Sequence, residues 1–289
     1  MTKALADCLR NQTITDTKAG LLMLRALSEL NGYAIEASDG LIGHIEQVYM
    51  DDDKWVIRYF VVKTGGWLDT REVLLSPISL GELHAKARTL SVRLTKDKVK
   101  NGPSIDLHKP VSRQQEVQFN DYYGWSPYWG GLGLWSRWGL PTMMAMPRHP
   151  NDHHQVMRQA GDHHLRSSRE VVGYHLHAID DQVGHVDDFI IDDETWAIRY
   201  MVVNTSNWGF GGKVLLAPDW IASVRADDRI VEVLVTRDAI THCPEWDAGM
   251  PITGAYEARL LEYYRRRQAW LKDPHASAAV ATPHDPRTP

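Results

Sequence analysis

An internal duplication constrains this chain more than any other feature of its sequence. Residues 32–123 align with residues 173–264 at a constant offset of about 141 residues, without a gap, and about 31 of roughly 92 aligned positions are identical. The clearest block is DDDKWVIRYFVVKTGGW from Asp51, which recurs as DDETWAIRYMVVNTSNW from Asp192. A period of this length indicates two copies of a whole domain rather than a solenoid of short repeats.

Each copy has the sequence pattern of a small β domain. Apolar and polar residues alternate in short runs, as at Ile57, Tyr59 and Val61, and turn-forming residues such as Asp51–Asp53 and Gly81 separate the runs. We expect strands near residues 33–36, 42–50, 55–63, 71–76 and 89–94, with counterparts about 141 residues later. Five or six short strands in fewer than about 100 residues favour a closed barrel, because closure removes exposed strand edges. The predicted fold class is mainly β: two small antiparallel β-barrels from an internal duplication, with a few short helices.

Three motifs carry a resemblance to a known family. They are GYxI leading to GHI (Gly32–Ile45), DD…WxIRY (Asp51–Tyr59) and V-L-L-x-P (Val73–Pro77). These motifs resemble the PRC-barrel domain, which is named after the cytoplasmic domain of the photosynthetic reaction centre H subunit and has a relative in a bacterial ribosome maturation factor. The whole chain is most similar to tandem PRC-barrel proteins of bacteria. The resemblance implies a small β-barrel that makes protein contacts and has no chemistry of its own.

The duplication also predicts how the chain is divided. The predicted segments are an N-terminal extension (1–26), copy 1 (27–121), a linker rich in Trp, Gly, Pro and His (122–165), copy 2 (166–255), a C-terminal helix (256–272) and a tail (273–289). Leu260, Tyr264 and Trp270 are expected on one side of that helix. The tail has too little apolar surface to order itself.

Composition and charge argue against several classes of protein. A net charge of −5 gives no overall attraction to phosphate, so no nucleic-acid partner is expected. The formal charge is near −2 over residues 27–123 and near −10 over residues 168–264, which favours a basic protein partner for copy 2 or simple solubility. Cys8 and Cys243 form no paired motif, and no signal peptide or run of about 18 apolar residues occurs. We therefore expect a cytoplasmic protein without a transmembrane segment, and peripheral membrane association and the oligomeric state stay open.

The linker contains the candidate interaction residues. Trp125, Trp129, Trp135 and Trp138 lie in a stretch with little charge, and rings of this size are costly to leave exposed. We expect them to pack between the two copies. The alternative is that they anchor a partner or a membrane surface.

The same linker contains the weak candidates for a metal site. His153, His154, His163 and His164 lie beside aspartates, and imidazole with carboxylate can bind zinc, nickel or copper. The spacing of a structural zinc site is absent from this stretch. No metal is therefore predicted.

Two further pairs of residues repeat in both copies. His44 and His185 follow equivalent glycines at the start of a strand, and a structural role is expected for both. The acidic runs Asp51–Asp53 and Asp192–Glu194 lack the alternating oxygen ligands of a calcium loop. They are expected to be hairpin turns.

The function predicted from these residues is a non-enzymatic protein-interaction module built from two PRC-barrel domains. No GxSxG, Walker A, GxGxxG or HExxH pattern occurs, and we predict no catalytic residue and no cofactor. The partner is an unknown protein. Two alternatives stay open: a peripheral component of a photosynthetic or electron-transfer membrane complex, and a metal- or ligand-binding protein with a site in the His-rich linker.

Overall fold

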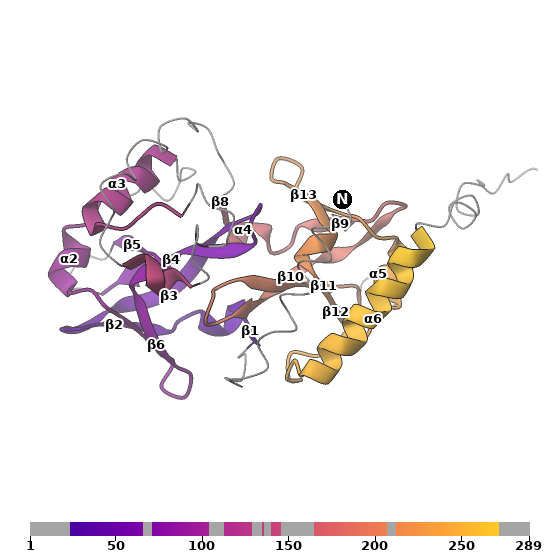
Figure 1. Cartoon of the computed structure of the whole chain (residues 1–289), viewed down its shortest axis with the longest axis horizontal. Coiled ribbons are helices and arrows are strands. Elements are labelled where there is room, and N and C mark those ends of the chain that lie inside the picture. The colour runs from indigo at the N-terminus through magenta and orange to yellow at the C-terminus, as the bar shows by residue number, and fades with distance from the viewer. Residues whose placement is uncertain are drawn as a thin grey trace, which may run out of the picture.

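The computed structural model describes residues 24–65, 71–103, 113–128, 135, 140–145, 165–206 and 212–271. Two β-rich lobes, copy 1 and copy 2, lie side by side along the longest axis (Figure 1). The predictions made for residues 1–23, for the His-rich part of the linker and for the tail lie outside the described residues.

Copy 1 contains a sheet with the strand order β5-β4-β3-β2-β7-β6. Its elements are β2 (Ala34–Ala37), β3 (Gly40–Asp51), β4 (Val56–Thr64), β5 (Glu72–Leu75), η3 (Pro77–Ser79), β6 (Leu80–His84), β7 (Thr89–Val92), α2 (Lys96–Lys100) and α3 (Arg113–Tyr123). All five strands predicted for this copy are present, within two residues of the expected ends. The sequence pattern missed β6.

Copy 2 repeats this topology with the equivalent order β12-β11-β10-β9-β14-β13, and β15 is added beside β12. Its elements are β9 (His175–His177), β10 (Gln182–Asp192), β11 (Ile198–Asn204), β12 (Lys213–Leu216), η8 (Pro218–Trp220), β13 (Ile221–Arg225), β14 (Ile230–Val233), α5 (Arg237–Thr241), β15 (Glu245–Trp246) and α6 (Gly254–Leu271). The mainly β fold and the duplication are therefore confirmed.

The sheets differ from the predicted closed antiparallel barrels in two respects. One strand pair in each copy is parallel, β2 with β7 and β9 with β14. Within the described residues, no ladder joins β5 to β6 or β12 to β13, so neither sheet closes. The turns η3 and η8 stand at these two corners, and Pro77 and Pro218 lie in their first turn. Proline fixes φ and has no N–H to donate, so it ends a strand ladder and redirects the chain.

Three glycines of the strands are explained by close packing. A Cβ on Gly43 would lie 2.1 Å from a carbonyl oxygen of β4, and one on Gly184 would lie 2.3 Å from a carbonyl oxygen of β11. Gly81, expected in a turn, lies within β6, where a Cβ would be 2.4 Å from the Ser91 hydroxyl. Glycine inside a strand often marks such a close approach. The prediction of a turn at Gly81 was therefore wrong.

The strands β1 (Leu24–Ala26) and β8 (Leu165–Ser167) join the two copies. β1 precedes copy 1 in the sequence but pairs antiparallel with β10 of copy 2. β8 precedes copy 2 but pairs antiparallel with β3 of copy 1. Each strand continues into a short helix, η1 (Leu27–Leu30) or α4 (Ser168–Val171), which packs on the sheet that its strand has joined. The copies thus exchange equivalent segments. The sequence had assigned β1 to the N-terminal extension and only Leu165 of β8 to the linker, with the remaining residues of both segments in the copy that follows them.

The β3–β4 and β10–β11 hairpins meet between the lobes. The backbone N–H of Ile57 donates to the carbonyl of Trp196 at 2.9 Å, and that of Ile198 donates to the carbonyl of Trp55 at 2.7 Å. Both tryptophans have a left-handed backbone, with φ of 50° and 61°, which is rare for a bulky residue. Trp196 packs edge-on against Phe60 of copy 1, with ring centroids 4.9 Å apart.

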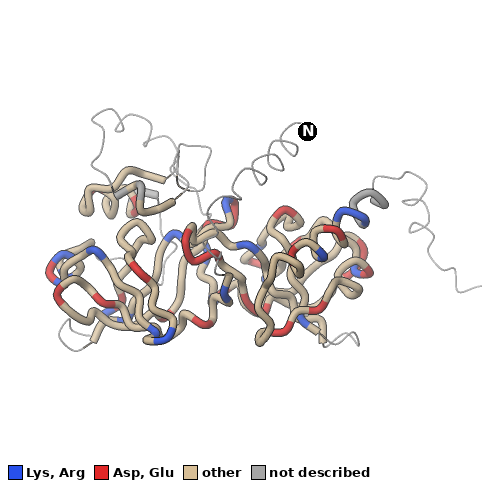
Figure 2. Tube along the Cα trace, turned by 60° about the horizontal axis from the view of Figure 1, so that its bottom comes forward, with Lys and Arg blue, Asp and Glu red and all other residues tan. Residues whose placement is uncertain are grey.

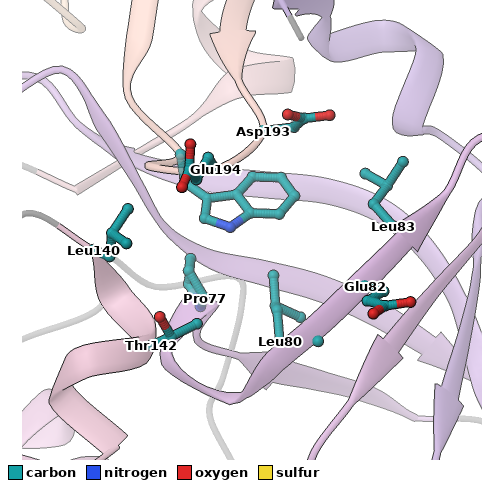
Figure 3. Close-up of a pocket in the computed structure, with 10 residues that line it drawn as sticks. Pro77, Leu80, Glu82, Leu83, Leu140, Thr142, Asp193 and Glu194 are labelled. Atoms are coloured by element: carbon teal, nitrogen blue, oxygen red, sulfur yellow. The ribbon is translucent and has the colours of Figure 1, made fainter. Parts of the chain in front are cut away.

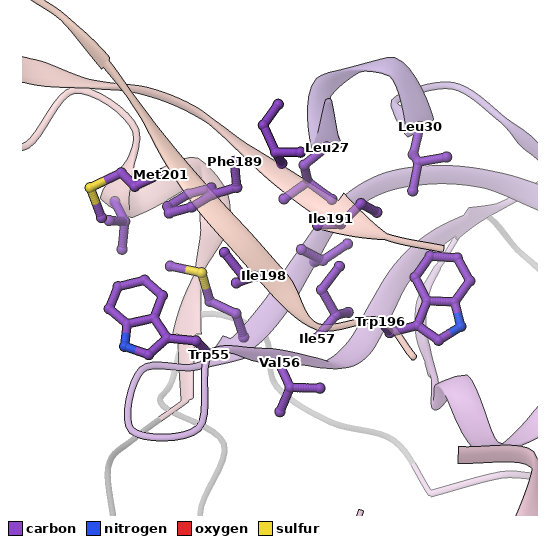
Figure 4. Close-up of a cluster of buried hydrophobic side chains, with 14 of the residues drawn as sticks. Leu27, Leu30, Trp55, Val56, Ile57, Phe189, Ile191, Trp196, Ile198 and Met201 are labelled. Carbon is purple, nitrogen blue, oxygen red and sulfur yellow. The ribbon is translucent and has the colours of Figure 1, made fainter. Parts of the chain in front are cut away.

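These contacts create one hydrophobic core shared by both copies (Figure 4). Figure 4 shows Trp55 and Trp196 at opposite ends of this cluster, with Leu27, Ile57 and Phe189 between them. The cluster mixes residues of both copies and of the exchanged helix η1. Because burial of apolar area is the main stabilising term in folding, we expect the two copies to unfold as one unit.

Two ion pairs fasten the exchanged strands. Arg25 of β1 contacts Asp193 of copy 2 at 2.6 Å, and Arg166 of β8 contacts Asp52 of copy 1 at 2.9 Å. The two pairs are related by the same offset of about 141 residues. The exchange is therefore reciprocal at the level of side chains as well as of strands.

The helices α3 and α6 are equivalent parts of the two copies. The hydroxyl of Tyr59 on β4 donates to Glu116 of α3 at 3.0 Å, and that of Tyr200 on β11 donates to Glu257 of α6 at 2.8 Å. Burial, and then the nearby glutamate, raise the pKa of both tyrosines, so both remain donors. In α6, Leu260 is buried as predicted, and so is Tyr264. The C-terminal helix thus completes copy 2 as α3 completes copy 1.

Candidate functional site

A groove lies between the two copies where β6 faces the β10–β11 hairpin (Figure 3). Its cavity volume is about 410 Å³, near the lower end of the roughly 300–1,000 Å³ of ligand pockets. Pro77, Leu80 and Leu83 of copy 1 line it, together with Trp196 of copy 2 and Leu140, which precedes η4 (Pro141–Ala145). This inter-copy groove suits one or two amino-acid side chains.

Three carboxylates stand along the inter-copy groove. Asp193 is neutralised by Arg25 at 2.6 Å. Glu82 and Glu194 are exposed, and Figure 3 shows them on opposite sides of the groove. Neither forms an ion pair with a lysine or arginine of the described residues, and the nearest basic group to Glu82 is the His84 ring at 3.8 Å. Within the described part of the chain, two negative charges at this site are therefore not paired with a permanent cation.

The groove also offers hydrogen-bonding groups. The side chain of Trp196 is buried, and its Nε1 donates to none of the described residues. By contrast, Nε1 of Trp135 donates to the carbonyl of Thr195 at 2.9 Å. The hydroxyl group of Thr142 belongs to the same lining. Since Nε1 of Trp196 is not one of the buried side-chain atoms that lack a hydrogen-bond partner, it is accessible, and a carbonyl entering the groove can accept a hydrogen bond from it.

The duplication relates this groove to a second position, where β13 of copy 2 and the β3–β4 hairpin of copy 1 supply the equivalent residues. The polar residues there are different. Ser223 stands where Glu82 does, and its hydroxyl donates to a neighbouring glutamate at 2.7 Å. Asp53 stands where Glu194 does, and it pairs with the adjacent lysine at 3.1 Å. The two free carboxylates are thus a property of one side only.

A second cavity of about 180 Å³ lies where η1 and α4 meet the two long strands β3 and β10. Ser28 of η1 donates to Asp188 of β10 at 2.5 Å, and Arg169 of α4 contacts Glu46 of β3 at 3.4 Å. Burial raises the pKa of Asp188 above its ordinary value, and the hydrogen bonds from Ser28 partly oppose that shift. These polar groups hold one copy to the other, so this cavity belongs to the interface.

The two acidic runs form hairpin turns, as predicted. Oδ1 of Asp51 accepts the backbone N–H groups of Asp53 at 3.1 Å and of Lys54 at 2.9 Å. Oδ1 of Asp192 accepts the equivalent pair of N–H groups at 2.9 and 3.1 Å. Within the described part of the chain, no three His, Cys, Asp or Glu side chains gather as a metal-binding group.

The comparison with protein families agrees with this repeated architecture. The model of the PRC-barrel domain matches twice, at residues 24–99 and 165–240. The chain belongs to the PRC-barrel domain family. Both matches begin at the exchanged strands β1 and β8, so each PRC-barrel domain gives its first strand to the other domain. No curated protein matches the chain.

The candidate tryptophans have different places around the two PRC-barrel domains. Trp135 is buried between them, because its indole donates to Thr195 of copy 2 and lies 4.9 Å from the Arg58 guanidinium of copy 1. Trp125 is buried against α3 of copy 1, stacked on Tyr123 with centroids 4.5 Å apart, and not between the domains. Neither ring is an exposed anchor. Trp129 and Trp138 lie outside the described residues.

The candidate histidines do not meet at a site in the described residues. His44 and His185 lie in β3 and β10 as equivalent strand residues, after the glycines that the close strand approach requires. His153, His154, His163 and His164 lie outside the described residues. Within the part of the chain that the structure describes, no helix has both the length and the hydropathy needed to cross a bilayer.

Sequence reasoning missed the inter-copy groove and the exchange that creates it. The exchange had a signal, because Leu24-Arg25 recurs as Leu165-Arg166 at the same offset, just outside the aligned region. The groove had none, since its residues come from β6, the segment before η4, and a hairpin more than 100 residues away.

Proposed function

We propose that this chain is a non-enzymatic protein-interaction module in which the two PRC-barrel domains act as one unit and the inter-copy groove receives the partner. The observation that carries the proposal is that both copies build the groove. It has apolar walls, and beside them stand two carboxylates that pair with no lysine or arginine of the described residues. A site of this kind exists only when both domains are in place. The fused pair therefore presents a surface that a single domain lacks.

The chemistry of the described residues supports a binding role rather than a catalytic one. Cys243 is buried and lies 3.3 Å from the hydroxyl of Tyr264, and burial raises its pKa to about 12. A thiol with such a pKa is a poor nucleophile at neutral pH. The tyrosines of the central strands likewise donate to glutamates within the fold.

The test is affinity capture with the full chain as bait, followed by reconstitution of the captured complex from purified components. Leu83→Lys places a charge in the groove, and Val224→Lys places the same charge at the equivalent position of copy 2. We expect the parent and Val224→Lys to form a stoichiometric complex that Leu83→Lys does not form. Circular dichroism checks that both variants fold.

A complex that forms equally well with all three baits would contradict a role for the inter-copy groove. Turnover of a substrate by the purified chain would contradict the non-enzymatic assignment.

A further inference from the structure

We infer that the ligand of the inter-copy groove is an extended, basic peptide segment of a protein partner, which inserts an arginine or lysine side chain between the two copies. This inference rests on the proposed function and specifies the chemistry of the partner. Figure 3 shows the residues that carry it.

The first step of the argument is the combination of apolar walls with negative charge. Leu80, Leu83 and Pro77 can cover the aliphatic stem of a long cationic side chain. Arginine and lysine bury their stems along apolar surface while the charged end stays at the rim. Glu82 and Glu194 stand at that rim without a lysine or arginine partner in the described residues. An apolar ligand would leave both charges unused, and an acidic one would be repelled.

The second step concerns the backbone of the ligand. The Trp196 indole N–H has no acceptor among the described residues, and the Thr142 hydroxyl lines the same cavity. A peptide carries carbonyl groups next to its side chains, so it can satisfy the indole donor while its cation reaches the carboxylates. A free polyamine or metal ion carries no such acceptor.

The third step is the charge of the surroundings. Acidic residues outnumber basic ones along copy 2, which contributes Glu194 and Trp196 to the groove (Figure 2). A negative field of this kind speeds encounter with a basic segment and disfavours acidic ones. The equivalent place on the other side keeps apolar residues but has Ser223 and a paired Asp53, so it should not bind the same peptide.

The inference is tested on the full chain by fluorescence polarisation with a fluorescein-labelled peptide, Ala-Leu-Arg-Leu-Arg-Ala. The control probe has both arginines replaced by citrulline, which keeps the shape and removes the charge. We expect the arginine probe to bind at least about tenfold more tightly, and its affinity to fall as salt rises from about 50 to about 500 mM.

Matched variants locate the binding site. The pair Glu82→Gln and Glu194→Gln together should raise the Kd of the arginine probe about tenfold, because both rim charges are lost. Asp53→Asn at the equivalent position should leave the Kd within about twofold. All three positions are exposed, so we expect no change in thermal unfolding that could be mistaken for lost binding.

Three outcomes would overturn the inference: no binding up to about 1 mM probe, equal binding of the citrulline probe, or equal weakening by Asp53→Asn. If the probe fails while the captured partner still depends on Leu83, the proposed function stands and the peptide chemistry is wrong. If neither depends on the groove, both proposals fail.

Discussion

Arg58 of copy 1 and Arg199 of copy 2 occupy equivalent positions on the central strands β4 and β11, but their surroundings differ. Arg58 is 2% exposed, pairs with Asp51 at 2.8 Å and lies 3.7 Å from the ring centroid of Tyr128. Arg199 is only partly buried, and no ion pair joins it to Asp192 within the described residues. Tyr128 and Trp135, which follow α3 in the sequence, place their rings against Arg58, and within the described residues no ring lies against Arg199. The duplicates thus keep a common fold and differ in what has been packed onto it.

In contrast to these arginines, the contacts that join the two copies are alike in both directions. Trp55 and Trp196 should therefore be of similar importance. We expect Trp55→Ala and Trp196→Ala each to lower the free energy of unfolding by about 3–5 kcal/mol, the usual cost of truncating a large buried aromatic residue. Urea unfolding followed by circular dichroism measures both. If one variant loses most of its stability and the other almost none, the shared core is not symmetric.

Substituting each of the two arginines of the central strands should lower the free energy of unfolding by unequal amounts. Removing one partner of a buried ion pair leaves an uncompensated charge, so Arg58→Met should cost about 3 kcal/mol or more. Arg199→Met, at a partly exposed position, should cost less than about 1 kcal/mol. Thermal and urea unfolding of the two variants compare them directly. Equal losses would mean that the cover over Arg58 contributes nothing to stability.

The next largest expected loss in the free energy of unfolding comes from breaking the ion pairs of the exchanged strands. Arg25→Gln and Arg166→Gln should each cost about 1–2 kcal/mol, since each removes charge-assisted hydrogen bonds that are partly buried. A double-mutant cycle with Asp193→Asn isolates the first pair. A coupling energy near zero would show that β1 is held by its backbone ladder and apolar contacts alone.

The smallest expected effect depends on pH. Burial raises the pKa of Asp188, so its contribution to stability is complete below the unfolded pKa of about 3.9 and is lost as pH rises through the folded pKa. Asp188→Asn removes this loss. We expect the variant to gain stability relative to the parent between about pH 4 and pH 7.

The equivalent residue in copy 1 is Gln47, which carries no charge and accepts the Ser167 hydroxyl at 2.6 Å. Gln47→Glu is the matched control, since it should introduce a similar dependence on pH. A pH-independent difference between Asp188→Asn and the parent would contradict the assignment to Asp188.

Much of the fold could be predicted from the sequence because its signals are local. The five strands of copy 1, the Asp51 and Asp192 turns, and the apolar side of α6 all depend on residues close together in the chain. Closure failed as a prediction because it depends on where β6 lies relative to β5, which no local pattern contains. The strand β4 has almost no exposed face, since α3 and copy 2 cover what alternation would assign to solvent.

The candidate site was less predictable because it requires both copies. Glu82 and Glu194 are more than 100 residues apart, and each is an ordinary exposed glutamate in the sequence. The tryptophans were the stronger signal, but burial of Trp125 and Trp135 serves the fold and not an exposed surface. What makes Glu82 distinctive is that it pairs with no lysine or arginine of the described residues, and this depends on the folded arrangement rather than on any local sequence pattern.

The exchange of β1 and β8 also has a consequence in time. During synthesis, β1 emerges first, but its partner Asp192 is made 168 residues after Leu24. At about 5–20 residues per second, that interval is roughly 10 to 30 s. Throughout it, the nascent first domain has no place for its own leading strand, and until Leu165 is made, 141 residues after Leu24, it also lacks the β8 strand that completes β3. Domains usually fold in order as they leave the ribosome, whereas here the first domain must wait for the second.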